Sequence, residues 1–221
     1  MAKKVALINI GDSPITGIEE EIQYYFSDFE VVEEGALDGM SKAELDGVLH
    51  RGEGDILTVE RNDGSFVRLS KEAVDPYVGR AIERAKEQGC QIFYLHCTGF
   101  FPKLTHKGIL IKPGRLLKSI VTQFSQETTV AILTPTPQHI GQVERKWSEA
   151  ACRKTVIPVH PFDYRETILK KADEWSSYDV LLLDCTSYGM AFVRELRKYY
   201  KGLILCPLTM AFAQCKEIAE I

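Results

Sequence analysis

The sequence predicts an α/β protein whose sheets are mostly parallel. Short and nearly continuous apolar runs alternate with amphipathic stretches along almost the whole chain, as in folds whose strands are covered by helices on both faces. The sequence also contains an internal echo, because QIFYLHCTGF at 91–100 and DVLLLDCTSYG at 179–189 follow one pattern. Each runs from an apolar strand through a polar residue into Cys, Thr, a small residue and an aromatic residue. Since one copy falls in each half of the chain, we expect two half-domains of similar design.

The expected strands are short apolar runs such as KVALINI, and the expected helices carry apolar residues three or four positions apart. In chain order, the strands are predicted at 4–10, 30–34, 91–96, 108–112, 129–134, 155–160, 179–184 and 202–206. The helices are predicted near 17–27, 41–48, 71–88, 114–124, 137–150, 164–175, 189–200 and 208–220.

One segment departs from this alternation. Residues 55–70, DILTVERNDGSFVRLS, alternate between apolar and polar and are divided by Asn62-Asp63-Gly64, a strong hairpin signal. We therefore expect a β-hairpin insertion in the first half. The long helix after it has Ser70 as its N-cap and ends at Gly89, unless Pro76 moves its start forward.

The composition indicates an ordinary globular protein in a reducing compartment. Among 221 residues, 45% are hydrophobic and 26% charged, with a net charge of −4 and no long Lys/Arg run, so a nucleic-acid partner is not expected. The apolar run near the N-terminus stops at Gly11, too soon for a signal or membrane segment. The six cysteines form no CxxC pair. We therefore expect a cytoplasmic protein with reduced thiols and no membrane partner.

Two cysteines stand out from the rest. Cysteine is usually buried packing, and we expect that of Cys90, Cys152, Cys206 and Cys215. Cys97 and Cys185, however, each follow a polar residue at a strand's end and precede Thr and a small residue. Loops at the carboxyl ends of parallel strands are where α/β sheets bind ligands.

Several kinds of cysteine site fit less well. A cysteine phosphatase needs an arginine six positions after the nucleophile, where this chain has Lys103 and, in the second loop, Ala191. A zinc site is not expected, because adjacent residues such as His96 and Cys97 point to opposite faces of a strand. A disulfide between the two loops is ill suited to a reducing compartment. A Cys-His protease site leaves the second loop unexplained.

Acid/base chemistry by two thiols explains the duplication. One thiolate can remove a proton from a carbon atom while a thiol on the opposing half-domain returns one to the other face, which inverts the stereocentre. Loop amides, a nearby cation or a helix N-terminus can lower a thiol pKa from about 8.5 towards neutrality. The developing enediolate would be held by the amides and hydroxyls of Thr98-Gly99 and Thr186-Ser187. This chemistry needs no cofactor, and none is expected.

Several segments resemble the AroM family, a member of the aspartate/glutamate racemase-like superfamily. They are Ile10–Pro14, Glu34–Gly39, Cys97–Pro102, Pro113–Leu117 and Leu183–Thr186. The resemblance spans nearly the whole chain. It implies two Rossmann-like α/β half-domains with the active-site cleft between them and a C-terminal helix that returns to the first half. The implied bounds are 1–113 plus 208–221 for the N-terminal half-domain and 114–207 for the C-terminal one.

The resemblance also bears on activity. It implies a cofactor-independent racemase superfamily, but no settled substrate. Some similar sequences lack the first cysteine, whereas this chain has both, which favours two-base chemistry. The family often has an arginine after Ser-Pro, where this chain has Ile15. A cation that could bind an acidic substrate is therefore missing from that loop.

For each remaining candidate site residue, a structural role is an alternative to a role in the site. Gly11, Asp12 and Ser13 follow the first strand; Asp12 is expected to bind a substrate amine or steer a thiol, and Ser13 to bind a carboxylate, unless they cap the helix near residue 17. Arg115 is a candidate carboxylate-binding cation or a surface residue. For His96 and Asp184, structural hydrogen bonding is favoured. Trp147 and Trp175 are expected in the core or at an interface, which leaves a homodimer open.

The sequence therefore predicts a cofactor-independent racemase or epimerase of a small carboxylate, possibly an amino acid, with Cys97 and Cys185 as its acid/base pair. One alternative is a decarboxylase or cis–trans isomerase that uses one cysteine. Another is a non-catalytic protein that binds a small acid.

Overall fold

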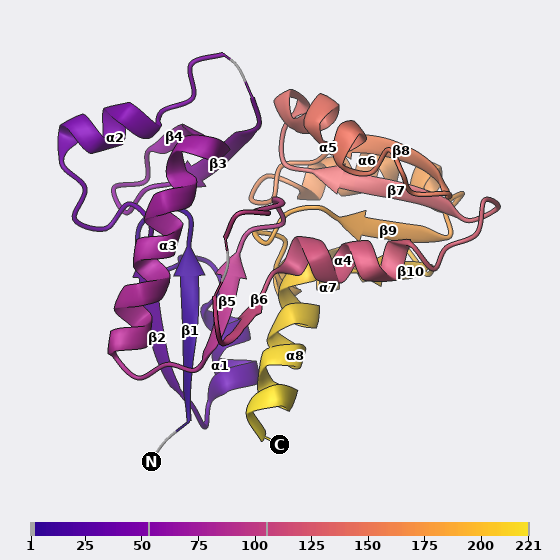
Figure 1. Cartoon of the computed structure of the whole chain (residues 1–221). Helices are drawn as coiled ribbons and strands as arrows, with labels where there is room; N and C mark the ends of the chain where they lie inside the picture. Colours follow the sequence, from indigo (N-terminus) through magenta and orange to yellow (C-terminus); the bar gives the residue numbers. More distant parts are fainter. Residues whose placement is uncertain (1–2, 53, 105, 221) are drawn as a thin grey trace. The chain divides into compact units, whose positions relative to one another are not determined.

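A computed structural model of the protein describes residues 3–52, 54–104 and 106–220 (Figure 1). The chain divides into two compact units: unit 1 is Met1–Lys112 with Ala211–Ile221, and unit 2 is Pro113–Met210. The half-domains expected from the sequence are 1–113 plus 208–221 and 114–207. That these segments are separate domains stays a prediction. Each unit has its own parallel sheet.

The sheet of unit 1 has the order β2-β1-β5-β6, and every pair in it is parallel. In the central strand β1, Asn9 lies opposite Gly35 on one side and His96 on the other. The loops that follow β1, β2 and β5 therefore leave from a single edge of the sheet. The strands are β1 (Lys4–Asn9), β2 (Glu30–Gly35), β5 (Ile92–His96) and β6 (Ile109–Ile111).

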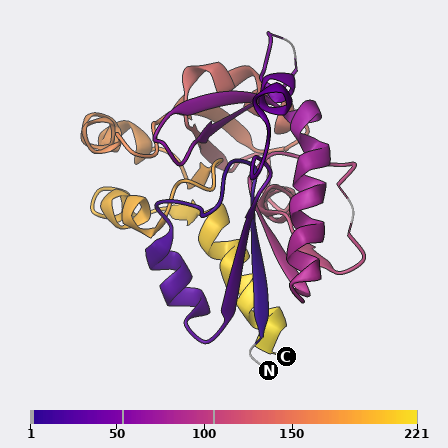
Figure 2. The same ribbon diagram turned by 90° about the vertical axis from the view of Figure 1, so that its left-hand side faces the viewer.

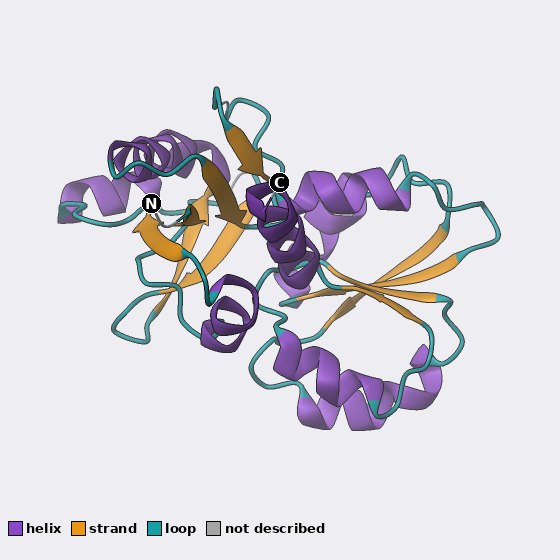
Figure 3. Cartoon of the chain, turned by 90° about the horizontal axis from the view of Figure 1, so that it is seen from below, coloured by secondary structure: helices purple, strands orange, loops and turns teal. Residues whose placement is uncertain are grey.

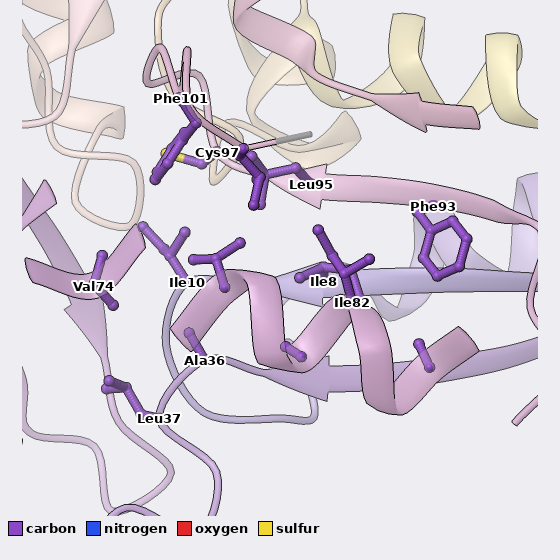
Figure 4. Close-up of a cluster of buried hydrophobic side chains, with 14 of the residues drawn as sticks. Ile8, Ile10, Ala36, Leu37, Val74, Ile82, Phe93, Leu95, Cys97 and Phe101 are labelled. Atoms are coloured by element: carbon purple, nitrogen blue, oxygen red, sulfur yellow. The ribbon is translucent and has the colours of Figure 1, made fainter. Parts of the chain in front are cut away.

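Helix α3 (Lys71–Glu87) packs on one face of this sheet because alternate strand residues point towards it. Figure 4 shows Ile8, Phe93 and Leu95 of the strands beside Ile82 of the helix, with Cys97 in the same cluster. The helix contributes its apolar stripe to this cluster: Val74, Val78, Ala81, Ile82 and Ala85.

The opposite face is covered by α1 (Glu19–Phe26) and by residues 211–220 of α8 (Pro207–Glu220). Figure 2 shows these two helices on one side of the strands and α3 on the other. The ring of Phe212 lies 4.8 Å from that of Tyr94 on β5 and 4.8 Å from that of Phe26 on α1. Aromatic packing thus attaches the C-terminal helix to unit 1.

The predicted hairpin is confirmed. Strands β3 (Ile56–Glu60) and β4 (Phe66–Ser70) pair antiparallel, and Gly64 adopts the positive φ of +79° that its turn requires. Leu57 and Val59 point from β3 into the core cluster of unit 1. The short helix α2 (Lys42–Val48), which precedes the hairpin, begins with a capping box between its N-cap serine and the glutamate three residues later.

The long helix α3 begins where the sequence predicts it. The Ser70 hydroxyl accepts a hydrogen bond from the Ala73 N–H, and the helix runs on through Pro76. The alternative start at Pro76 is therefore wrong. Gly89, with φ of +88°, follows the helix and ends it in the left-handed conformation.

The sheet of unit 2 has the order β10-β9-β7-β8, again with parallel pairs, and Figure 3 shows helices on both of its faces. Trp147 and Trp175 are buried, 2% and 0% exposed, so both are core residues. The strands are β7 (Thr129–Thr134), β8 (Arg153–Pro158), β9 (Val180–Leu183) and β10 (Leu203–Leu205). The helices are α4 (Pro113–Val121), the 3₁₀ turn η1 (Pro137–His139), α5 (Ile140–Lys146), α6 (Arg165–Trp175) and α7 (Met190–Arg197).

The predicted fold class, α/β with two mostly parallel sheets and a hairpin inserted in the first half, is confirmed. The largest difference lies at 137–150, where a 3₁₀ turn and the short α5 replace one helix. No helix within the described ranges is long and apolar enough to cross a membrane.

Gly35 provides a test of the close packing between β2 and the loop after β1. A Cβ added there would lie 2.5 Å from the carbonyl oxygen of Gly11 and 2.6 Å from the nitrogen of Ser13. We expect Gly35→Ala to lower the free energy of unfolding by about 1–3 kcal/mol, because backbone must move to admit the methyl group. Urea denaturation measures the change.

The matched control is Gly47→Ala. Gly47 lies inside α2, and a Cβ there would meet nothing within 4 Å. This variant should gain about 0.5–1 kcal/mol from helix propensity alone. Equal stability of the Gly35 variant and the wild type would contradict the close approach.

Candidate active site

The two cysteine loops share one local geometry. Cys97 directly follows β5, and the backbone N–H of Gly99 donates a hydrogen bond to its Sγ at 3.2 Å. Cys185 follows β9 after one residue, and the N–H of Ser187 donates to its Sγ at 3.4 Å. In each loop the sulfur faces the amide two residues on. The repeated sequence pattern therefore corresponds to a repeated local structure. A backbone N–H that donates to the sulfur favours the thiolate form of the cysteine.

The two thiols lie in different surroundings. Cys97 is 7% exposed and belongs to the apolar core cluster of unit 1, beside Leu95 and Phe101 (Figure 4). Cys185 is partly exposed, yet burial of its sulfur raises the pKa of the thiol above its ordinary 9.0, against the hydrogen bonds from Ser187. At neutral pH, Cys185 is consequently a protonated thiol.

The two loops share a buried threonine after the cysteine but differ at the next position. Thr98 and Thr186 are both buried, 8% and 3% exposed. A Cβ added at Gly99 would lie 3.2 Å from both the Cys97 sulfur and the ring of Phe101, so the first loop fits tightly around its glycine. The second loop has Ser187 at the equivalent position.

A buried lysine holds the end of the Cys97 loop. Lys112, 9% exposed, donates from Nζ to the carbonyl oxygen of Phe101 at 3.0 Å and to that of Leu104. Lys103, at the position where a phosphatase would need arginine, is exposed. Lys112 is not predicted from the sequence, because its partners are backbone atoms earlier in the chain and leave no sequence pattern.

The loop after β1 is held by residues far away in sequence. The N–H and hydroxyl of Ser13 donate to the two carboxylate oxygens of Asp38 at 2.9 and 2.7 Å. Asp38 also accepts the N–H of Gly35 at 2.6 Å, which explains one acidic residue of the Glu34–Gly39 segment. Asp12, 8% exposed, pairs with Arg61 of the hairpin.

The alternative that Asp12 or Ser13 caps a helix is wrong. Helix α1 begins only at Glu19, and its N-cap Ile18 has no side-chain capping bond. Because Asn9 lies opposite His96 in adjacent parallel strands, the loops at 10–13 and 97–99 leave the same edge of unit 1. The structure thus brings Gly11, Asp12 and Ser13 to the edge that carries Cys97.

In unit 2 the corresponding edge carries Cys185 and the end of β7. The N–H of Asp184 donates to the carbonyl oxygen of Leu133, which fixes the Cys185 loop next to Thr134. The hydroxyl of Thr134 is buried and has no hydrogen-bond partner within the described ranges. Thr134 is not predicted as a site residue from the sequence, although it is the polar end of an apolar strand.

The polar residues before the two cysteines form structural hydrogen bonds, as favoured from the sequence. His96 Nδ1 lies 3.1 Å from the Tyr94 hydroxyl, and burial lowers the pKa of His96 from 6.5 to about 3. Asp184 accepts hydrogen bonds from Lys146 Nζ at 2.5 Å and Trp147 Nε1 at 3.0 Å.

The other predicted residues lie as follows. Arg115 is exposed on the first turn of α4, so its role as a carboxylate-binding cation stays a prediction. No group of three metal-ligating side chains, and no disulfide, occurs in the part of the chain that the structure describes. Burial raises the pKa of three of the remaining thiols, that of Cys215 to about 12; all four are buried, as expected of Cys90, Cys152, Cys206 and Cys215.

Comparison with known proteins adds a family and three similar folds. The family model described as AroM protein matches residues 5–219. The aspartate racemase of Picrophilus torridus has a TM-score of 0.62 at 14% identity, over 99% of this chain and 94% of that one. An arylmalonate decarboxylase has 0.61 at 11% identity, over 98% and 92%. The allantoin racemase of Klebsiella pneumoniae has 0.59 at 14% identity, over 99% and 88%. No curated protein sequence matches the chain.

His96 should make the protein sensitive to acid. Its pKa of about 3 in the folded chain lies below the unfolded value of 6.5, so between these values the unfolded chain binds a proton that the native one does not. The contribution of His96 to the free energy of unfolding is fully present above pH 6.5. It is lost as the pH drops towards 3, by about 1.4 kcal/mol per pH unit. Urea denaturation from pH 8 to 4 measures the slope.

His96→Asn should lessen that slope, since asparagine takes up no proton while its oxygen can still accept the Tyr94 hydroxyl. The exposed His160 provides the control variant His160→Asn, which should keep the wild-type slope. An unchanged slope in His96→Asn would mean that His96 is not a buried neutral histidine.

Proposed function

Because the chain belongs to the AroM family, we propose that it is a cofactor-independent racemase or epimerase of a small carboxylate, an amino acid in the simplest case. The observation that carries the proposal is the repeated cysteine loop, in which Cys97 and Cys185 each accept an amide N–H from two residues on. The fold that the chain shares with racemases of aspartate and allantoin supports it.

In the proposed reaction, Cys97 as thiolate removes the proton from the carbon next to the carboxylate. The electron pair moves into an enediolate, and Cys185 delivers its thiol proton to the opposite face. In the reverse direction the two cysteines exchange roles, so no redox partner is needed. The raised pKa of Cys185 supports its role as the acid in the resting enzyme.

The surrounding loops supply the binding groups in this proposal. Amides of Thr98-Gly99 and Thr186-Ser187 stabilise the enediolate, whose charge develops only during the reaction. Gly11, Asp12 and Ser13 line the substrate site from the loop after β1, with Asp12 held by Arg61 and Ser13 by Asp38, and Arg115 is a candidate for its carboxylate.

A second candidate is a decarboxylase that uses one cysteine as its acid. The fold that the chain shares with an arylmalonate decarboxylase favours it. In this candidate reaction, loss of carbon dioxide from the substrate creates an enediolate like that of the racemase reaction, and a single thiol protonates it. A cis–trans isomerase with one nucleophilic cysteine, and a protein that only binds a small acid, are the remaining alternatives.

Serine substitutions separate these functions. With each enantiomer of the proteinogenic amino acids in D2O, proton NMR should show exchange at the α-carbon together with inversion by the wild type. Cys97→Ser and Cys185→Ser should each lower inversion about 10²–10⁴-fold, the usual contribution of a positioned acid or base. Cys90→Ser is the matched control, because Cys90 is buried at the other end of the same strand segment.

Each alternative has its own outcome. Wild-type inversion by both serine variants contradicts two-base chemistry. Release of carbon dioxide from a phenylmalonate probe, with one cysteine dispensable, identifies the decarboxylase. No turnover, with a melting temperature raised by small carboxylates, identifies a binding protein.

A further inference from the structure

The hairpin lies across both loops at the carboxyl edge of unit 1. A Cβ at Gly99, in the Cys97 loop, would lie 3.7 Å from Cδ2 of Leu57. A Cβ at Gly11, in the loop after β1, would lie 3.3 Å from Cβ of Val59. Strand β3 of the hairpin thus lies close to the glycine of each loop, and its side chains form part of the same edge.

Arg61 lies next on this face of the hairpin. Side chains alternate along a strand, so positions 57, 59 and 61 share one face. Leu57 and Val59 are buried in the core cluster of unit 1. Arg61 continues their row to Asp12, with 2.5 Å between its Nε and Oδ2 of Asp12. The N–H and side-chain amide of Asn62 add hydrogen bonds to Asp12 Oδ2 and to the carbonyl oxygen of Ser13.

The guanidinium of Arg61 has hydrogen-bond donors that its ion pair with Asp12 does not use. Its ion pair uses Nε alone, and among the described residues Nη1 and Nη2 have no hydrogen-bond partner. The side chain is 26% exposed. The two Nη groups form the planar fork that binds a carboxylate through two parallel hydrogen bonds.

We propose that Arg61 binds the carboxylate of the substrate through Nη1 and Nη2, with Asp12 orienting the guanidinium from its Nε side. The hairpin then supplies the cation that the loop after β1 lacks at Ile15. The substrate class is a small carboxylate whose anionic group lies at the edge that carries Cys97. That this anion is also the molecule racemised rests on the proposed function, whereas its binding can be tested without turnover.

The partial neutralisation of Arg61 by Asp12 has a consequence for specificity. Attraction by net charge is weakened, so affinity depends on the two directed hydrogen bonds. A lysine at this position can keep the ion pair with Asp12 but has no second pair of donors on a rigid plane. Arg61→Lys therefore separates the role in substrate binding from the role in holding the hairpin.

The experiment is an NMR titration of the full-length protein with malonate, and with its uncharged analogue malonamide. The wild type should bind malonate in preference to malonamide. Arg61→Lys and Arg61→Gln should each weaken malonate binding at least about tenfold, the cost of losing hydrogen bonds to a charged group. Asn62→Ala is the matched control: it removes the side-chain bond to Ser13 but keeps the guanidinium, and it should bind malonate within about twofold of wild type.

Three results overturn the proposal: a wild type that does not prefer malonate, Arg61 variants that bind it normally, or an Asn62→Ala variant that loses as much affinity as they do. The last would mean that the ion pair only holds the hairpin in place. Normal racemisation by the cysteine variants with lost malonate binding in Arg61→Lys would reject the proposed function and leave the carboxylate site standing.

Discussion

The parallel pairing of β1 with β5 is the constraint on which the candidate site of unit 1 depends. With Asn9 opposite His96, both strands end at the same level, so the loops that follow must leave from one edge. The apolar runs of these strands are continuous because helices cover both faces of the sheet, α3 on one and α1 with α8 on the other. The first Cys-Thr turn occurs in one of these loops.

Charged side chains from elsewhere in the chain fix the loops at this edge. Lys112 holds carbonyl groups after Cys97, Asp38 holds Ser13, and Arg61 holds Asp12. In unit 2, Lys146 and Trp147 hold Asp184 in front of Cys185. A buried charge costs less when it is paired, and removal of one partner leaves the other uncompensated. These contacts therefore restrict where each loop can move.

The sequence predicts the parts of this arrangement that depend on local pattern. Apolar runs predict the strands, Asn62-Asp63-Gly64 predicts the hairpin, and the repeated Cys-Thr turn predicts two equivalent loops. It does not predict Arg61, Asp38 or Lys112, because each acts on residues brought near only by folding. The alternative that Asp12 and Ser13 cap a helix is wrong for the same reason: their hydrogen bonds go to Asp38 and the hairpin, and α1 starts later. The alternative that α3 starts at Pro76 is wrong because packing of the apolar face of α3 outweighs the loss of one helical hydrogen bond at the proline.

The two loops have diverged in a way that bears on chemistry. Gly99 brings its amide close to the Cys97 sulfur inside a crowded loop, whereas Ser187 adds a hydroxyl beside Cys185. Burial still dominates at Cys185 and keeps that thiol protonated. A carboxylate bound at the edge of unit 1 would repel a thiolate there, because like charges disfavour each other's ionised form. In the proposed reaction, the guanidinium of Arg61 would offset this repulsion where the substrate anion binds. The hairpin would then do more than cover the loops, because it would allow an anionic substrate and a thiolate base to share one edge.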